Sequence, residues 1–175
     1  IFVLDPVPSH MRGFSTLSET LEPDASNLAG LIAALAPDVK RRFEGALQKY
    51  VKDLPEKDIV KVFAEREGKL KTDALLYCEE RWKPGEPTVL VDSRGMSDGT
   101  LRFLAIITAL MTRPSGSLLI VEEIDNGLHP SRSGTLMKVL KELSTERGID
   151  VIVTTHNPAF LNACGPEMLP FIVIA

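Results

Sequence analysis

Residues 118–123 read Leu-Leu-Ile-Val-Glu-Glu, and residues 151–158 read Val-Ile-Val-Thr-Thr-His-Asn-Pro. Each stretch is a short apolar run that ends in polar residues, a pattern typical of a buried strand in a parallel sheet. Helical patterns over residues 99–111 and 130–146 precede the two strands. Strands that alternate with helices predict right-handed β-α-β units. We therefore expect an α/β fold, a mostly parallel sheet with flanking helices, and chemistry at the carboxyl ends of these strands.

The rest of the chain predicts smaller elements around this core. Residues 1–5 read as a buried strand, which Pro6 ends because proline lacks the N–H that a ladder needs. Helices are expected over residues 28–35, from Pro37 onward, and briefly near Pro158. Further strands are expected over residues 59–64, 75–82, 88–92 and 171–174. The second and third of these flank a loop with Pro and Gly, which predicts a β-hairpin.

Composition places the chain among globular proteins. Of its 175 residues, 44% are hydrophobic and 25% are charged, and this balance excludes general disorder. Apolar runs stay shorter than the ~18 residues that a membrane span needs. The two cysteines fit no metal spacing, which favours a reduced, cytoplasmic protein. The chain begins inside one apolar run and ends inside another, so we expect it to be a fragment of a longer protein.

The charge of the chain is uneven. The formal net charge is −4, yet residues 40–71 hold ten Lys and Arg against six Asp and Glu. A basic segment in an acidic protein can contact nucleic acid. Because acidic residues are interleaved throughout this segment, a solvated helix and loop is the favoured interpretation.

Two adjacent carboxylates follow the first strand. Successive strand residues face opposite sides, so Glu122 and Glu123 are expected to do different jobs. One can hold Mg²⁺, which prefers oxygen ligands, and the other can orient or deprotonate an attacking water. The alternative is a strand that simply ends in polar residues. His156, at the end of the second strand, can contact a phosphate or polarise a water, although a lone histidine is more often structural.

Two further turns open helices. Ser97-Asp98-Gly99-Thr100 precedes an apolar helix whose free N–H groups and dipole favour an anion, and the glycine lets a phosphate approach the backbone. An ordinary N-cap is the alternative. Asp125-Asn126-Gly127-Leu128-His129-Pro130 is a tight turn whose Asp125 and His129 are close enough in sequence to join the carboxylates. A simple turn and helix start is the alternative for this second motif.

The order of these motifs is more specific than any one of them. This order resembles the core of ABC-type ATPases: a Ser-x-Gly-Thr helix start, a strand ending Glu-Glu, then Asn-Gly-Leu-His-Pro, and a strand ending Thr-Thr-His-Asn-Pro. The likeness is greatest to the soluble branch: AAA-21 and AAA-15 ATPases, overcoming-lysogenization-defect ATPases, and RecF, Rad50 and SMC heads. It is specific over residues 97–160 and looser over residues 1–35. The resemblance implies a P-loop NTPase fold.

The resemblance also implies a role for each motif. Ser97, Asp98, Gly99 and Thr100 would form the signature motif, which in this family binds the γ-phosphate held by an opposing subunit. Arg102, one helical turn further on, would support that contact.

The remaining motifs would form the rest of the nucleotide site. Glu122 would be the Walker B acid on the Mg²⁺ side, and Glu123 the general base that activates water. Residues 126–129 would form the D-loop at the dimer seam, with Asn126 and His129 as cofactor-binding residues. His156 would be the switch histidine that reaches the γ-phosphate.

One part of such an ATPase is missing from the sequence. No stretch reads Gly-x-x-x-x-Gly-Lys-[Ser/Thr], the P-loop that cradles phosphates. We expect it to lie upstream, in sequence outside this chain. Residues 1–92 would then be the lid or insert and the middle region of the ATPase head, and residues 93–175 its C-terminal core.

Taken together, the resemblance implies an ATPase that uses ATP and Mg²⁺ and forms a homodimer around the nucleotide. DNA is the expected partner, in repair, chromosome maintenance or phage defence, with an effector protein as a second one and no role for a membrane. Two other functions stay open. One is a non-catalytic dimerisation module with a degenerate nucleotide site. The other is a metal-dependent nuclease built on Glu122, Glu123 and Asp125, which the lack of an Asp-x-Asp pair disfavours.

Overall fold

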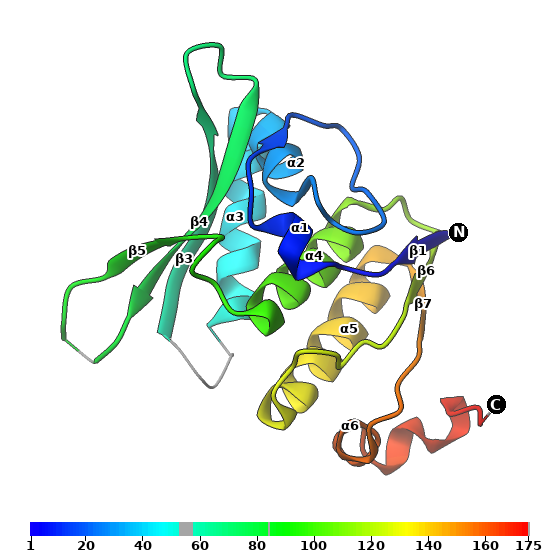
Figure 1. Cartoon of the computed structure of the whole chain (residues 1–175). Coiled ribbons are helices and arrows are strands. Elements are labelled where there is room, and N and C mark those ends of the chain that lie inside the picture. The colour runs from blue at the N-terminus through cyan, green and yellow to red at the C-terminus, as the bar shows by residue number, and fades with distance from the viewer. Residues whose placement is uncertain (53–57, 84, 175) are drawn as a thin grey trace.

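A parallel sheet is at the centre of the fold, as the sequence predicts. The computed structural model describes residues 1–52, 58–83 and 85–174. Three strands lie in the order β1-β6-β7, namely Phe2–Leu4, Leu118–Val121 and Asp150–Val153 (Figure 1). Both pairings are parallel, and Leu4, Val121 and Val153 share one register position. The carboxyl ends of all three strands therefore meet at one edge of the sheet.

Two helices cover one face of this sheet. α4 (Asp98–Thr112) and α5 (Ser133–Arg147) pack together on it (Figure 1). Val121 is fully buried on the covered face, whereas Val3 and Ile152 on the other face are 43% and 52% exposed. α4 is buried along most of its length, from Gly99 to Leu110, between α5 on one side and a second layer on the other.

The second layer is built on an antiparallel sheet. Its strands lie in the order β2-β4-β3, with β5 also paired to β4. Their bounds are Ser15–Thr16 (β2), Asp58–Glu67 (β3), Asp73–Arg81 (β4) and Val89–Asp92 (β5). α2 (Leu28–Ala34) and α3 (Pro37–Val51) pack on this sheet, and α1 (Pro8–Met11) links β1 to β2 (Figure 1). The predicted hairpin of β4 and β5 is confirmed, and residue 84 of its loop lies outside the described residues.

One predicted strand is wrong, and the parallel sheet includes a strand from each side of the expected division at residue 92. Residues 171–174 form no strand: α6 (Pro158–Ala163) is followed by a 3₁₀ helix, η2 (Pro166–Phe171), and residues 172–174 have no regular structure. A β-branched run becomes a strand only where a neighbouring strand pairs with it, and no described strand does so here. β1 joins the parallel sheet although it precedes residue 93, so the expected division into residues 1–92 and 93–175 does not separate the two sheets.

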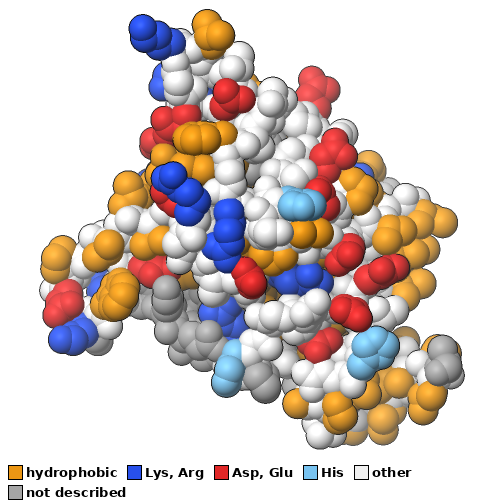
Figure 2. Space-filling view, in the orientation of Figure 1, with side chains coloured by type: hydrophobic (Ala, Val, Ile, Leu, Met, Phe, Trp, Pro, Cys, Tyr) orange, Lys and Arg blue, Asp and Glu red, His pale blue; other side chains and the backbone are white. Residues whose placement is uncertain are grey.

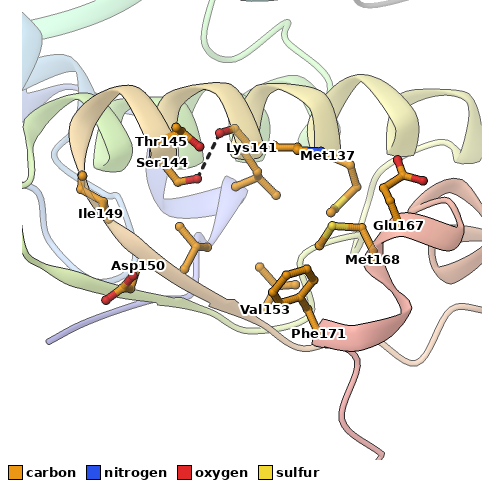
Figure 3. A pocket seen from close by; sticks show the side chains of 13 residues that line it. Met137, Lys141, Ser144, Thr145, Ile149, Asp150, Val153, Glu167, Met168 and Phe171 are labelled. Atoms are coloured by element: carbon orange, nitrogen blue, oxygen red, sulfur yellow. Dashed lines mark hydrogen bonds between the residues drawn. The ribbon is translucent and has the colours of Figure 1, made fainter.

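A groove runs along the outer edge of β7. It has a volume of about 530 Å³ and lies between α5, β7 and η2 (Figure 3). Its lining is mainly apolar, with Met137, Leu140, Ile149, Val151, Val153, Met168 and Phe171. Within the described ranges, no strand pairs with this edge of β7. The sheet is therefore open toward the groove.

Two expectations from composition can be compared with the structure. Cys78 is buried, Cys164 is half-buried, and the two form no disulfide bond with each other. None of the helices in the described part of the chain has the length and apolar character that crossing a membrane requires.

Candidate functional site

The two adjacent carboxylates lie on a turn after β6, here called the carboxylate turn (residues 122–126). The Glu122 amide donates to the Leu4 carbonyl at 3.3 Å, and the Glu123 amide donates to the Thr154 hydroxyl at 3.0 Å. Glu123 has a φ of 44°, in the left-handed region that costs an L-residue about 1–2 kcal/mol. Hydrogen bonds to both neighbouring strands thus hold the turn while Glu123 adopts an unfavourable backbone conformation.

A small hollow lies beyond this turn, where β6 and β7 end. It has a volume of about 270 Å³ and is lined by Glu123, Asp125, Asn126, His156 and Asn157. His156 Nε2 lies 3.5 Å from Glu123 Oε1, and the Asn126 side-chain amide donates to Glu123 Oε2 at 3.3 Å. Acidic side chains gather on this face, next to a histidine (Figure 2). The fold therefore brings three of the expected site residues, Glu123, Asn126 and His156, into one place.

Two threonines at the end of β7 fix this arrangement, and sequence reasoning assigned them no role. Thr154 accepts the Glu123 amide, as described above, and its own backbone carbonyl accepts the Ile124 amide at 3.0 Å. The Thr155 hydroxyl donates to Asp125 Oδ1 at 2.5 Å. Their position directly after an apolar strand was the available signal, because polar side chains there face the neighbouring strand's turn.

Glu122 lies next to the hollow. Its side chain is exposed, and it is not one of the lining residues. Among the residues that the structure describes, no three His, Cys, Asp or Glu side chains are grouped so as to hold a metal ion by themselves. Mg²⁺ usually keeps several waters and binds through one or two carboxylates plus substrate phosphates. The oxygen donors here therefore fit a magnesium ion that arrives with a phosphate ligand.

The start of α4 carries Ser97, Asp98, Gly99 and Thr100, here called the signature turn. Ser97 is the N-cap, and its hydroxyl accepts the Thr100 amide at 3.2 Å. The N-cap interpretation is therefore confirmed for this serine. Ser97 and Asp98 remain exposed, so the helix N-terminus still faces solvent, where its N–H groups and dipole favour an anion.

Residues 126–129, the predicted D-loop, pack directly against the signature turn. A Cβ atom on Gly99 would lie 2.7 Å from the Gly127 carbonyl oxygen, so only glycine fits without a shift of the backbone. Buried Arg132, in the 3₁₀ turn η1 (Pro130–Arg132) that precedes α5, donates to the Thr100 hydroxyl at 3.3 Å. His129 is exposed, and neither it nor the signature turn lines the hollow. The expected site residues thus fall into two groups on one chain.

Arg102 connects these two groups. Arg102 is 4% exposed, and its guanidinium donates to the carbonyls of Glu122 at 3.3 Å, Glu123 at 3.2 Å and Pro6 at 2.6 Å. Burial lowers the pKa of this guanidinium, and the nearby Asp5 carboxylate, 3.7 Å away, counteracts part of that shift. The sequence led us to expect a phosphate contact for Arg102, but its guanidinium is occupied beneath the carboxylate turn.

Arg12 and Arg132 are site residues that sequence reasoning missed. Arg12 reaches Asp98 across 86 residues of sequence, and Arg132 reaches Thr100 across 32. No local pattern signals such contacts, because hydrophobic periodicity reports only on neighbours within one element.

Comparison with known proteins identifies the family of this chain. A family described as "AAA domain, putative AbiEii toxin, Type IV TA system" has a sequence model that matches residues 23–162. This chain belongs to that family. The AAA domain is 38% identical over 65 residues to ABC transporter G family member 4 of Dictyostelium discoideum, a match that covers 37% of this chain and 8% of that protein. It is 31% identical over 68 residues to the methionine import ATP-binding protein MetN of Nocardia farcinica, covering 39% and 20%.

The AAA domain thus spans at most a fifth of the length of these two relatives. Its fold is similar to a solved chain from work on the ATP-driven dimerisation and DNA-stimulated activation of SMC ATPases. The TM-score is 0.52 at 16% identity, over 72% of this chain and 76% of the other, so this likeness concerns the fold alone. Together with the family match, it confirms the expected α/β fold class and the expected membership of the AAA-21 group.

Proposed function

We propose that this AAA domain binds ATP with Mg²⁺, hydrolyses it, and dimerises around the nucleotide to act on DNA. The observation that carries the proposal is the hollow at the ends of β6 and β7, where Glu123, Asn126 and His156 converge. Phosphoryl transfer depends on positioning, charge stabilisation and orientation of the attacking group. A carboxylate, an amide and an imidazole around a small polar hollow are suited to these tasks.

Glu123 is the proposed general base. One carboxylate oxygen accepts the Asn126 amide and the other lies near His156, so the group is oriented while it stays 53% exposed to an entering water. A water held in the hollow would lose its proton to Glu123. The His156 side chain is 86% exposed and can reach a phosphate. Glu122 would hold Mg²⁺, which when bound neutralises part of the phosphate charge.

The signature turn is proposed to act on a second copy of the protein. It offers the N-terminus of α4 to an anion, yet it does not line the hollow of its own chain. A nucleotide in that hollow would therefore meet a signature turn from the opposite subunit of a homodimer. Asn126 and His129 of the D-loop, beside the signature turn, would then lie close to the seam.

DNA is the proposed partner of this dimer, with an effector protein as a second one. The described parts of the basic segment, residues 40–52 and 58–71, supply cationic side chains such as Lys40 and Lys61 on the second layer. The fold likeness to a chain from work on DNA-stimulated SMC ATPases agrees with this choice. We keep residues 1–92 as the proposed lid and partner-facing region, apart from β1, and residues 93–175 as the core that holds the nucleotide elements.

The P-loop has to come from a segment that this sequence does not contain. A P-loop follows a strand and delivers its N–H groups at that strand's carboxyl end. The open edge of β7 and the apolar groove beside it offer room for one more strand (Figure 3). A parallel strand there would end next to His156 and place its loop at the hollow.

The test is a Glu123→Gln variant of the full-length protein. We expect it to bind ATP as the wild type does, to turn over at least ~100-fold more slowly because general-base catalysis is lost, and to accumulate an ATP-dependent dimer. The control is Glu19→Gln, which removes an exposed carboxylate of the other layer and should change neither rate nor assembly. Equilibrium nucleotide binding, phosphate release and sedimentation measure the three properties.

Each other outcome rejects a particular part of the proposal. Unchanged turnover in Glu123→Gln rejects Glu123 as the base. A wild-type protein that binds no ATP rejects the ATPase and favours a non-catalytic interaction module. Cleavage of DNA with Mg²⁺ in the absence of ATP favours the nuclease. A protein whose turnover and assembly do not respond to DNA keeps the ATPase and removes DNA as its partner.

A further inference from the structure

Arg12 links the chain just after α1 to the loop that leads into the signature turn. Its Nη1 atom donates to the carbonyls of Ser93 at 3.1 Å, Arg94 at 3.0 Å and Met96 at 2.7 Å. In return, the Ser93 hydroxyl donates to the Arg12 carbonyl at 3.0 Å. The other guanidinium nitrogen, Nη2, is paired with the carboxylate of Asp98. One side chain therefore holds both the loop and the first residue of α4.

The Asp98 carboxylate stands where an anion would bind. It lies in the first turn of α4, and its side chain is 61% exposed. Carboxylates and phosphates compete for the positive end of a helix, and a carboxylate already there repels an incoming phosphate. The guanidinium of Arg12, 29% exposed, is the charged group in direct contact with Asp98. The nearby Arg94 guanidinium is instead paired with Asp92.

We propose that Arg12 is a positioning residue of the signature turn that also cancels the charge of Asp98. The turn can then accept a phosphate carried by a second subunit. This inference rests on the proposed function and adds to it a residue from the N-terminal region, 86 positions before Asp98 in the sequence. A purely structural clamp would need only the three carbonyls, whereas the contact with Asp98 places charge compensation at the anion site itself.

Charge compensation and a purely structural clamp predict different results for the double mutant Arg12→Gln/Asp98→Asn. Arg12→Gln keeps a side chain of moderate length but leaves Asp98 unpaired, so it should weaken the ATP-dependent dimer by about tenfold or more. Adding Asp98→Asn removes the uncompensated charge and should restore dimerisation to within about threefold of that of the protein with Arg12 and Asp98 intact. Restoration by a second mutation at the anion site is not expected of a clamp that only orders the loop. Arg94→Gln is the matched control, because its side chain is paired within the same loop but away from Asp98.

The measurement is sedimentation of the full-length protein with ATP, in a Glu123→Gln background that prevents turnover. Nucleotide binding at low protein concentration and thermal unfolding are followed in parallel, and Arg12→Gln should leave nucleotide binding unchanged. Loss of dimer that Asp98→Asn fails to restore overturns charge compensation. An unchanged dimer in Arg12→Gln overturns the whole inference.

Failure of the proposed function would be visible in the reference protein itself, which would bind no ATP or form no dimer. Hydrogen exchange of the ATP-free protein then decides on Arg12 alone. The amides of residues 95–101 should exchange faster in Arg12→Gln than in Arg94→Gln. Equal exchange in the two variants overturns the positioning role.

Discussion

Replacing Arg102 with methionine should destabilise the protein and loosen the carboxylate turn. Methionine fills a similar volume but donates nothing to the carbonyls of Pro6, Glu122 and Glu123. The bond to Pro6 is buried, and leaving such an acceptor unpaired costs about 1–3 kcal/mol. The other two carbonyls are part-buried and can regain some solvation, so each should add about 0.5–1 kcal/mol.

These losses in stability are partly offset, because the folded Arg102→Met variant no longer buries a charge. The Arg102 Nε–H is buried without a hydrogen-bond partner, and Asp5, the counter-ion at 3.7 Å, is largely exposed. We therefore expect a net loss of about 3 kcal/mol, at the lower end for truncating a buried charged group. In a domain of this size, that corresponds to a fall in Tm of about 6–12 °C. Arg113→Met is the control, since the Arg113 guanidinium only stacks on Phe2 at 4.0 Å, worth about 0.5–1 kcal/mol.

Urea unfolding and steady-state kinetics of the full-length protein test this reasoning. The kcat should fall with little change in KM, because Arg102 holds the backbone of Glu123 and does not touch the hollow. Arg102→Lys keeps the charge and should recover part of both losses. A loss of stability within 1 kcal/mol of that in Arg113→Met, or a KM that rises while kcat is constant, would refute the role assigned to Arg102.

Three other substitutions test the surroundings of the site. Gly99→Ala should lower the free energy of unfolding by about 1–3 kcal/mol and weaken ATP-dependent dimerisation, because the added Cβ would lie 2.7 Å from the Gly127 carbonyl oxygen. The control is Gly45→Ala, in an open position within α3, which should raise the free energy of unfolding by about 0.5–1 kcal/mol. Urea unfolding of both variants measures these changes. Thr154→Val removes the acceptor of the Glu123 amide and should cost about 1–2 kcal/mol, with turnover falling more than nucleotide affinity in single-turnover assays. Burial and the Glu67 carboxylate raise the pKa of Tyr77 to about 12, so the unfolded chain ionises first and the wild type should lose about 2 kcal/mol between pH 10 and pH 12. Urea unfolding of Tyr77→Phe at these two pH values should show that much less loss, and an equal loss in both proteins would contradict the shift.

The parallel strands and their functional ends were predictable because the signals are local. An apolar run such as residues 118–121 is typical of a strand in a parallel sheet, and the polar residues after it mark the carboxyl end. Parallel pairing then places Glu123 near His156 although 33 positions separate them, since both follow strands of one register. The N-cap at Ser97 is equally local, because its partner, Thr100, is three residues away.

The predicted strand at residues 171–174 fails for the opposite reason. β-branched residues favour extended backbone, but a strand also needs a partner whose hydrogen bonds it can share. Sequence pattern reports the preference of the segment and carries no information on whether an edge is available. The open edge of β7 lies across the groove from η2, and within the described residues nothing pairs with it. The apolar side chains of residues 173 and 174 therefore remain exposed.

The roles of the arginines are harder still to predict from sequence, since they depend on which segments the fold brings together. Arg102 follows the signature turn by two residues and invites the interpretation of a phosphate ligand, yet a side chain on α4 can point inward or outward with equal local pattern. Only the packing of α4 against β6 directs it to the Glu122 and Glu123 carbonyls. One helix then touches both groups of site residues: its first turn contacts the D-loop through Gly99, and its second turn holds the backbone of the proposed base. A ligand at the signature turn that displaces α4 would therefore also displace the backbone of Glu123 through Arg102. This coupling needs no conformational change in any other element.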